Sequence, residues 1–127
     1  MEDTKKFGER VRDLREAKAR TDPSFTVRRF AQTMGLSPSY ISMLERGEVN
    51  PPKADNIRKM AELLGCSADE LFALAKKVNP ELASIIVSNP EIVPDLLRTV
   101  RDMPSAKVRQ VLDFAEFQKS KKGENEQ

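Results

Sequence analysis

Two opposite signals for a helix boundary lie only two residues apart in this sequence, and this spacing constrains the fold more than any other feature. Gly35 supplies the left-handed turn that ends one helix. Ser37 and Pro38 supply an N-cap and a first helical position for the next helix. Thr26 is the N-cap expected for the first helix, and Gly47 closes the second. We therefore expect two short helices joined by a tight turn.

The apolar residues of the first short helix follow helical periodicity. Positions i, i+3, i+4 and i+7 are held by Val27, Phe30, Ala31 and Met34. Phe25 precedes the N-cap and can pack on Phe30 as a hydrophobic staple. We expect this face to be buried in a helical core.

The remaining periodicity is also helical, and no segment shows the alternation of a half-buried strand, so the predicted fold class is all-α. Three more helices are expected in the first part of the chain: one from Lys5 to Ala19, one that ends at Gly65, and one from Ala68 to about Lys77. Together with the two short helices they predict a five-helix domain over residues 1–77.

The C-terminal region, residues 78–127, is expected to hold about three helices. Pro80, Pro90 and Pro104 each lie near a helix start, where proline is tolerated. The last helix is expected from Ser105 to about Lys121, with a frayed polar tail over 122–127. This region would serve dimerisation or regulation.

Composition places the chain among soluble globular proteins, with 39% apolar and 33% charged residues. The longest purely aliphatic stretch, Ile85–Val87, is too short for a membrane span, and the charged N-terminal segment lacks the apolar core of a signal peptide. We expect a cytoplasmic protein that does not bind membranes.

The sequence offers little for catalysis. It has no histidine and one cysteine, Cys66, so neither a Cys/His zinc site nor an internal disulfide can form. Glycine-rich phosphate loops and serine-nucleophile motifs are absent, and most acidic residues alternate with lysine and arginine as on a solvated helix face. We expect no enzyme, no cofactor and no metal.

Charge is distributed unevenly along the chain. Residues 1–77 carry 15 Lys+Arg against 12 Asp+Glu, a balance of +3, whereas residues 78–127 carry 7 against 8, a balance of −1. The basic half is the candidate for binding a polyanion.

The second short helix, from Ser37 to Arg46, separates into two faces when its residues are placed 100° apart. One face holds Ile41, Leu44 and Glu45, and the opposite face holds Ser39, Ser42, Met43 and Arg46. Small hydroxyl side chains let a helix approach base edges in a DNA major groove, while an arginine can pair with a phosphate or a guanine. Met43 fits a thymine methyl group, although an apolar surface residue without a function is the alternative interpretation.

Two further observations concern charge. Arg28 and Arg29 lie in the first turn of their helix, where the dipole disfavours cations unless a phosphate docks there. Two solvated arginines without a ligand are the alternative interpretation.

Glu45 faces inward and needs a cationic partner, for which Arg15 is the best candidate. We expect the two to form a structural clamp.

The segment from Thr26 to Phe72 resembles the lambda-repressor-like, XRE-type helix-turn-helix family. Its matching elements are Ala31, Gly35-Leu36-Ser37-Pro38, Tyr40-Ile41-Ser42, Leu44-Glu45-Arg46-Gly47, Asn50-Pro51-Pro52 and Ala61-Glu62-Leu63-Leu64-Gly65. The resemblance covers about Phe7 to Lys77. It implies a five-helix bundle whose helix-turn-helix, about residues 27–46, places its second helix in the major groove.

Carried over by position, the resemblance puts Ser39, Ser42 and Met43 at the bases. It puts Thr26, Tyr40, Arg46 and Asn50 at or near phosphates, where Arg28 is also expected, and it supports the clamp of Arg15 with Glu45. Two positions depart from the family: Val27 stands where glutamine is frequent, and the segment Arg20–Ser24 is longer than the usual turn.

The function that these expectations favour is a dimeric transcriptional repressor on a palindromic double-stranded DNA operator, because one short helix makes too few base contacts alone. The alternative is an antitoxin or immunity-type regulator whose C-terminal half binds a toxin or peptidase.

Overall fold

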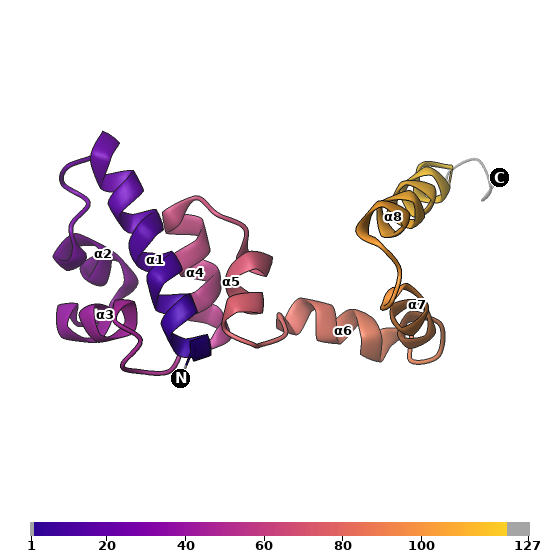
Figure 1. The fold of residues 1–127 in the computed structure, drawn as a ribbon, viewed down its shortest axis with the longest axis horizontal. Coiled ribbons are helices and arrows are strands. Elements are labelled where there is room, and N and C mark those ends of the chain that lie inside the picture. Colours follow the sequence, from indigo (N-terminus) through magenta and orange to yellow (C-terminus); the bar gives the residue numbers. More distant parts are fainter. Residues whose placement is uncertain (1, 122–127) are drawn as a thin grey trace. The chain divides into compact units, whose positions relative to one another are not determined.

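The computed structural model of the protein describes residues 2–121 as eight helices without strands (Figure 1). They are α1 (Glu2–Thr21), α2 (Val27–Met34), α3 (Pro38–Glu45), α4 (Ala54–Leu64), α5 (Ala68–Leu74), α6 (Pro80–Ser88), α7 (Ile92–Val100) and α8 (Ser105–Ser120). The predicted all-α class is confirmed. The tail 122–127, expected to fray, lies outside the described residues.

The chain divides into two units, one that runs to Ala83 and one that begins at Ser84. The first unit holds α1 to α5 and the start of α6, and the second holds the rest of α6 with α7 and α8. Within the described residues, no helix combines the length and apolarity needed to span a membrane.

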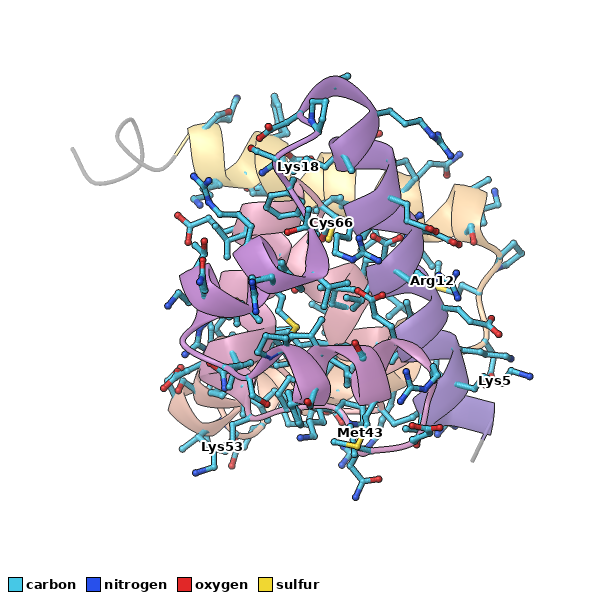
Figure 2. All side chains as sticks on the ribbon, turned by 90° about the vertical axis from the view of Figure 1, so that its left-hand side faces the viewer. Lys5, Arg12, Lys18, Met43, Lys53 and Cys66 are labelled. Atoms are coloured by element: carbon cyan, nitrogen blue, oxygen red, sulfur yellow. The ribbon has the colours of Figure 1, made fainter. Side chains whose placement is uncertain are left out.

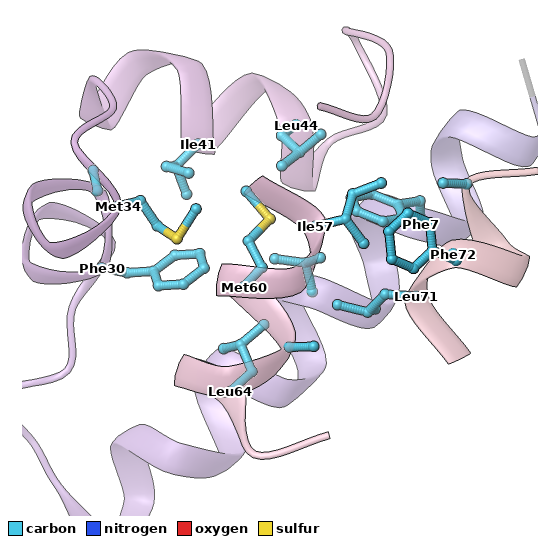
Figure 3. Close-up of a cluster of buried hydrophobic side chains, with 14 of the residues drawn as sticks. Phe7, Phe30, Met34, Ile41, Leu44, Ile57, Met60, Leu64, Leu71 and Phe72 are labelled. Carbon is cyan, nitrogen blue, oxygen red and sulfur yellow. The ribbon is translucent and has the colours of Figure 1, made fainter. Parts of the chain in front are cut away.

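The first unit is built around one hydrophobic core. Helix α1 packs against α3, α4 and α5, while α2 packs against α3 and α4. Figure 3 shows the central side chains, contributed by all five helices: Phe7, Phe30, Met34, Ile41, Leu44, Ile57, Met60, Leu64, Leu71 and Phe72. Each is at most 6% exposed, so the short helices α2 and α3 are held by packing rather than by their own helix propensity.

The boundaries of the two short helices follow the sequence signals. The Thr26 hydroxyl accepts a hydrogen bond from the Arg29 N–H at 3.1 Å, and the Ser37 hydroxyl accepts one from the Tyr40 N–H at 3.1 Å. Gly35 takes the left-handed conformation with φ 74°. The rings of Phe25 and Phe30 lie 5.6 Å apart, as a hydrophobic staple requires.

Three helices differ from the expectation at one or both ends. Helix α1 is longer at both ends than residues 5–19, and its last turn is continued by the Asp22 N–H, which donates to the Lys18 carbonyl. Helix α3 ends at Glu45, one residue earlier than predicted, because Arg46 is its C-cap. Helix α5 ends at Leu74 rather than near Lys77, because Lys76 turns the chain with φ 58°.

A glycine in the middle of α1 brings α1 and α3 together. A Cβ atom at Gly8 would overlap the carbonyl oxygen of Leu44 and lie 3.0 Å from that of Glu45. Only a residue without a side chain permits this approach. Gly8 therefore sets the distance at which the last turn of α3 rests on α1.

Candidate DNA interface

Helix α3 is fixed to the first unit by its inward face. Ile41 and Leu44 are fully buried, and Glu45 is 7% exposed. Leu36 and Tyr40 are partly buried and pack against the same core. The inward residues predicted from the sequence are thus the ones in contact with the core.

Glu45 forms a bidentate ion pair with Arg15 of α1. The Arg15 Nε donates to Glu45 Oε2 at 2.7 Å and an Arg15 Nη donates to Glu45 Oε1 at 2.9 Å. The two side chains are only 12% and 6% exposed, so water screens their attraction weakly. The hydrogen bonds with Glu45 raise the pKa of Arg15 above its usual value. The pair ties the C-terminal end of α3 to the middle of α1.

The opposite face of α3 points away from the core. Ser39 is exposed, whereas Ser42 and Met43 are partly buried, so Met43 is less open than the helical wheel suggests. The chain turns back after α3, and the Glu48 N–H donates to the Met43 carbonyl at 2.9 Å. Figure 2 shows Met43 at the lower edge of the view. The three predicted base-reading residues lie on one surface.

Arg46 lies beside this surface and has a partner that the sequence reasoning did not identify. Its Nε and one Nη donate to Glu48 Oε2 at 3.1 and 2.9 Å. This hydrogen bonding raises the pKa of Arg46 and lowers that of Glu48. The turn at Gly47, with φ 74°, brings the two side chains together. In the sequence, this glycine is the feature that could have indicated the pairing of Arg46 with Glu48. A phosphate at Arg46 would compete with Glu48.

The start of α2 presents a second basic position. Thr26, Arg28 and Arg29 are exposed, and the first turn contains no acidic residue. Asp22 precedes the helix, and its pKa is lowered first by the Ser24 hydroxyl that donates to it and then by nearby Arg29 and Lys18. Two exposed cations therefore lie in the first turn of α2, at the positive end of the helix dipole.

The other positions expected near phosphates lie within α3 and in the loop that follows it. Tyr40 is half-buried, and burial raises the pKa of its hydroxyl. Asn50 is exposed in the loop after α3, where it lines a depression with Thr4 and Glu48. Val27 packs against the core, so the position where the family often has glutamine presents no polar group here.

Comparisons with known proteins agree with this geometry. Residues 12–71 match the family model HTH_3, described as helix-turn-helix. The uncharacterized HTH-type transcriptional regulator RghRB of Bacillus subtilis (strain 168) is 35% identical over 69 residues, which make up 54% of this chain and 46% of that protein. No solved structure matches the chain.

The matched segment contains both short helices, the turn between them and the Arg15–Glu45 pair. Residues 12–71 therefore form a helix-turn-helix domain of the XRE type. The aligned part covers less than half of the length of the Bacillus subtilis relative. The helices from α6 onward lie outside the family match.

Proposed function

We propose that the protein is a sequence-specific DNA-binding transcriptional regulator that acts as a dimeric repressor on a palindromic operator. The observation that carries this proposal is the division of α3 into an inward face held by the core and Arg15, and an outward face that holds two serines and Met43. A rigidly held helix of this kind suits insertion into a major groove.

Each part of the surface has a distinct role in the proposal. Ser39, Ser42 and Met43 contact base edges, whereas five residues around them contact the sugar-phosphate backbone: Thr26, Arg28, Tyr40, Arg46 and Asn50. The backbone contacts set orientation and the base contacts set sequence preference.

Residues 1–77 bind DNA in this proposal and residues 78–127 dimerise or regulate, in the cytoplasm. Two copies are needed because one helix offers few base contacts against a genome of competing sites. The Bacillus subtilis relative is named as a transcriptional regulator, which supports the assignment of the matched half.

Selection of bound sequences from a random double-stranded DNA pool tests the proposal on the full chain. We expect an enriched inverted repeat with half-sites about one helical turn apart. Failure to enrich any sequence would overturn sequence-specific binding, and enrichment of one asymmetric site would overturn the palindromic operator.

Single substitutions then distinguish residues that contact bases from residues that do not. Ser42→Ala and Met43→Ala should each change preference at one operator position by about 1 kcal/mol. Ser67→Ala is the matched control, because Ser67 is exposed before α5 and its side chain makes no cap hydrogen bond. A uniform loss at all sequences for Met43→Ala would contradict its reading role.

A further inference from the structure

The loop between α3 and α4 carries Asn50, one of the positions proposed to contact the DNA backbone. Pro51 and Pro52 follow it directly. Each proline fixes its own φ and restricts the residue before it to an extended conformation. The segment from Asn50 to Pro52 therefore moves largely as one piece, and a contact that holds the prolines also determines where Asn50 lies.

Packing holds this loop on both sides of Asn50. Val49 is partly buried against the core, and Pro52 is buried, whereas Asn50 itself is exposed. Among the described residues, no backbone–backbone hydrogen bond is formed by Asn50, Pro51 or Pro52. The carbonyl groups of these residues are therefore open to a donor from a side chain.

Lys77, which follows α5, is such a donor. Its ammonium group donates to the Pro52 carbonyl at 2.9 Å and lies 3.5 Å from the Pro51 carbonyl, 25 and 26 residues earlier in the chain. A charged donor makes a stronger hydrogen bond than a neutral one. The chain after α5 is thus attached directly to the loop that follows α3.

The backbone of Lys77 is itself fixed to the first unit. Its N–H donates to the Phe72 carbonyl at 3.0 Å, and Phe72 is only 2% exposed. The preceding residue, Lys76, takes φ 58°, a left-handed conformation that is unfavourable for residues with a Cβ atom. The ammonium group that holds the loop is therefore carried by a turn anchored on a core residue.

We propose that Lys77 is a positioning residue for DNA binding, which places Asn50 at its phosphate by holding the carbonyl groups of Pro51 and Pro52. This inference rests on the proposed function, because the phosphate contact of Asn50 is part of it. Lys77 acts through Asn50 and neutralises no phosphate itself. Its removal therefore leaves the number of counterions released on DNA binding unchanged.

Nitrogen-15 relaxation of the full chain without DNA tests whether Lys77 holds the loop. Lys77→Met removes the ammonium group and keeps a long side chain, so the backbone order parameter of Asn50 should fall from about 0.85 toward about 0.6. Lys76→Met is the matched control, because it removes the same charge from the adjacent exposed residue and should leave this order parameter unchanged. An unchanged order parameter in Lys77→Met would overturn the inference.

Fluorescence anisotropy tests the consequence for DNA. Lys77→Met should weaken binding to operator and random DNA by about fivefold without a change in the salt slope, and Lys76→Met should not weaken it. In a chain that already carries Asn50→Ala, Lys77→Met should have almost no further effect. Additive losses would contradict action through Asn50. A salt slope reduced by about one would mean that Lys77 contacts a phosphate itself, which also overturns the inference.

Circular dichroism and thermal melting verify that each variant retains the folded first unit. A loosened loop without loss of affinity would overturn the role of Lys77 in DNA binding. A wild-type chain that binds no DNA would contradict the proposed function, whereas the relaxation comparison would still show whether Lys77 holds the loop. The two failures are therefore distinguishable.

Discussion

The first unit and the C-terminal helices treat apolar residues in opposite ways. In α1 to α5 the large hydrophobic side chains meet in one core, whereas in α6 to α8 they remain half open to water. Helices with apolar faces thus bury those faces in one region and leave them exposed in the other. The local sequence pattern determines where helices form, whereas burial of their apolar side chains requires another helix packed against them.

Truncation of one phenylalanine in each region tests this contrast most directly. Phe30→Ala removes a fully buried ring and should lower the free energy of unfolding of the first unit by about 3–5 kcal/mol. Phe114→Ala, at a site 63% exposed, should change the free energy of unfolding of the first unit by less than about 0.5 kcal/mol in dilute solution. Urea titrations followed by circular dichroism measure both, and equal losses would break the comparison.

The buried ion pair of the first unit gives the next largest effect. Arg15→Ala leaves Glu45 buried without its partner and should cost about 3 kcal/mol of unfolding free energy. Arg12→Ala, on the same helix, breaks the exposed pair with Glu16 and should cost less than about 1 kcal/mol. Similar losses for both variants in urea titrations would show that the Arg15 pair is not a clamp.

The close approach at Gly8 predicts an effect opposite to helix propensity. Alanine normally stabilises a helix relative to glycine by up to about 1 kcal/mol. Gly8→Ala should instead destabilise by about 2 kcal/mol, because its methyl group meets the Leu44 carbonyl. Thermal melting measures the sign, and a stabilised variant would mean that α1 and α3 can separate without cost.

The smallest effect concerns the surface of the first unit. Arg46→Ala should weaken binding to operator and random DNA alike and reduce the salt slope by about one. Glu48→Gln should strengthen binding to both, because it removes the competitor that holds Arg46. Fluorescence anisotropy over a salt series measures these changes, and an unaltered slope for Arg46→Ala would exclude the phosphate contact.

The same pair predicts a pH dependence. Arg46 holds the pKa of Glu48 below its usual value in the free protein, mainly through their hydrogen bond. A phosphate that takes Arg46 lets this pKa rise, so binding takes up protons. Affinity should therefore increase as pH falls through the acidic range in which Glu48 titrates. Glu48→Gln should remove that component of the slope.

Sequence patterns predicted most of the first unit because its signals are local. The N-caps Thr26 and Ser37 and the stop at Gly35 act on their immediate neighbours, and a helical wheel places Glu45 inward. The need of a buried carboxylate for a cation then points to Arg15. The caps and the stop depend on chemistry within a turn or two of the chain, whereas Arg15 lies 30 residues from Glu45 and is identified by the need to pair a buried charge.

The features that escaped prediction depend on backbone geometry, distant in the sequence for Gly8 and local for Glu48 and Lys76. From the sequence alone, Gly8 indicates only a locally weaker helix. The structure shows that carbonyl groups of α3 lie against it. From the sequence alone, Glu48 is an exposed charge in a loop. In the structure, the turn at Gly47 directs it toward Arg46. Helix α5 ends early although lysine has good helix propensity, and the positive φ of 58° at Lys76 is not indicated by its residue type.

The division of α3 also bears on how such a protein changes its target over evolution. Attachment to the core uses Ile41, Leu44 and Glu45, while the outward positions Ser39, Ser42 and Met43 take little part in it. Substitutions at these outward positions escape the stability cost that accompanies changes in a packed core. Under the proposed base contacts, a new target sequence would require the exchange of only three side chains on an unaltered scaffold, so duplicated copies would diverge in specificity before they diverge in fold.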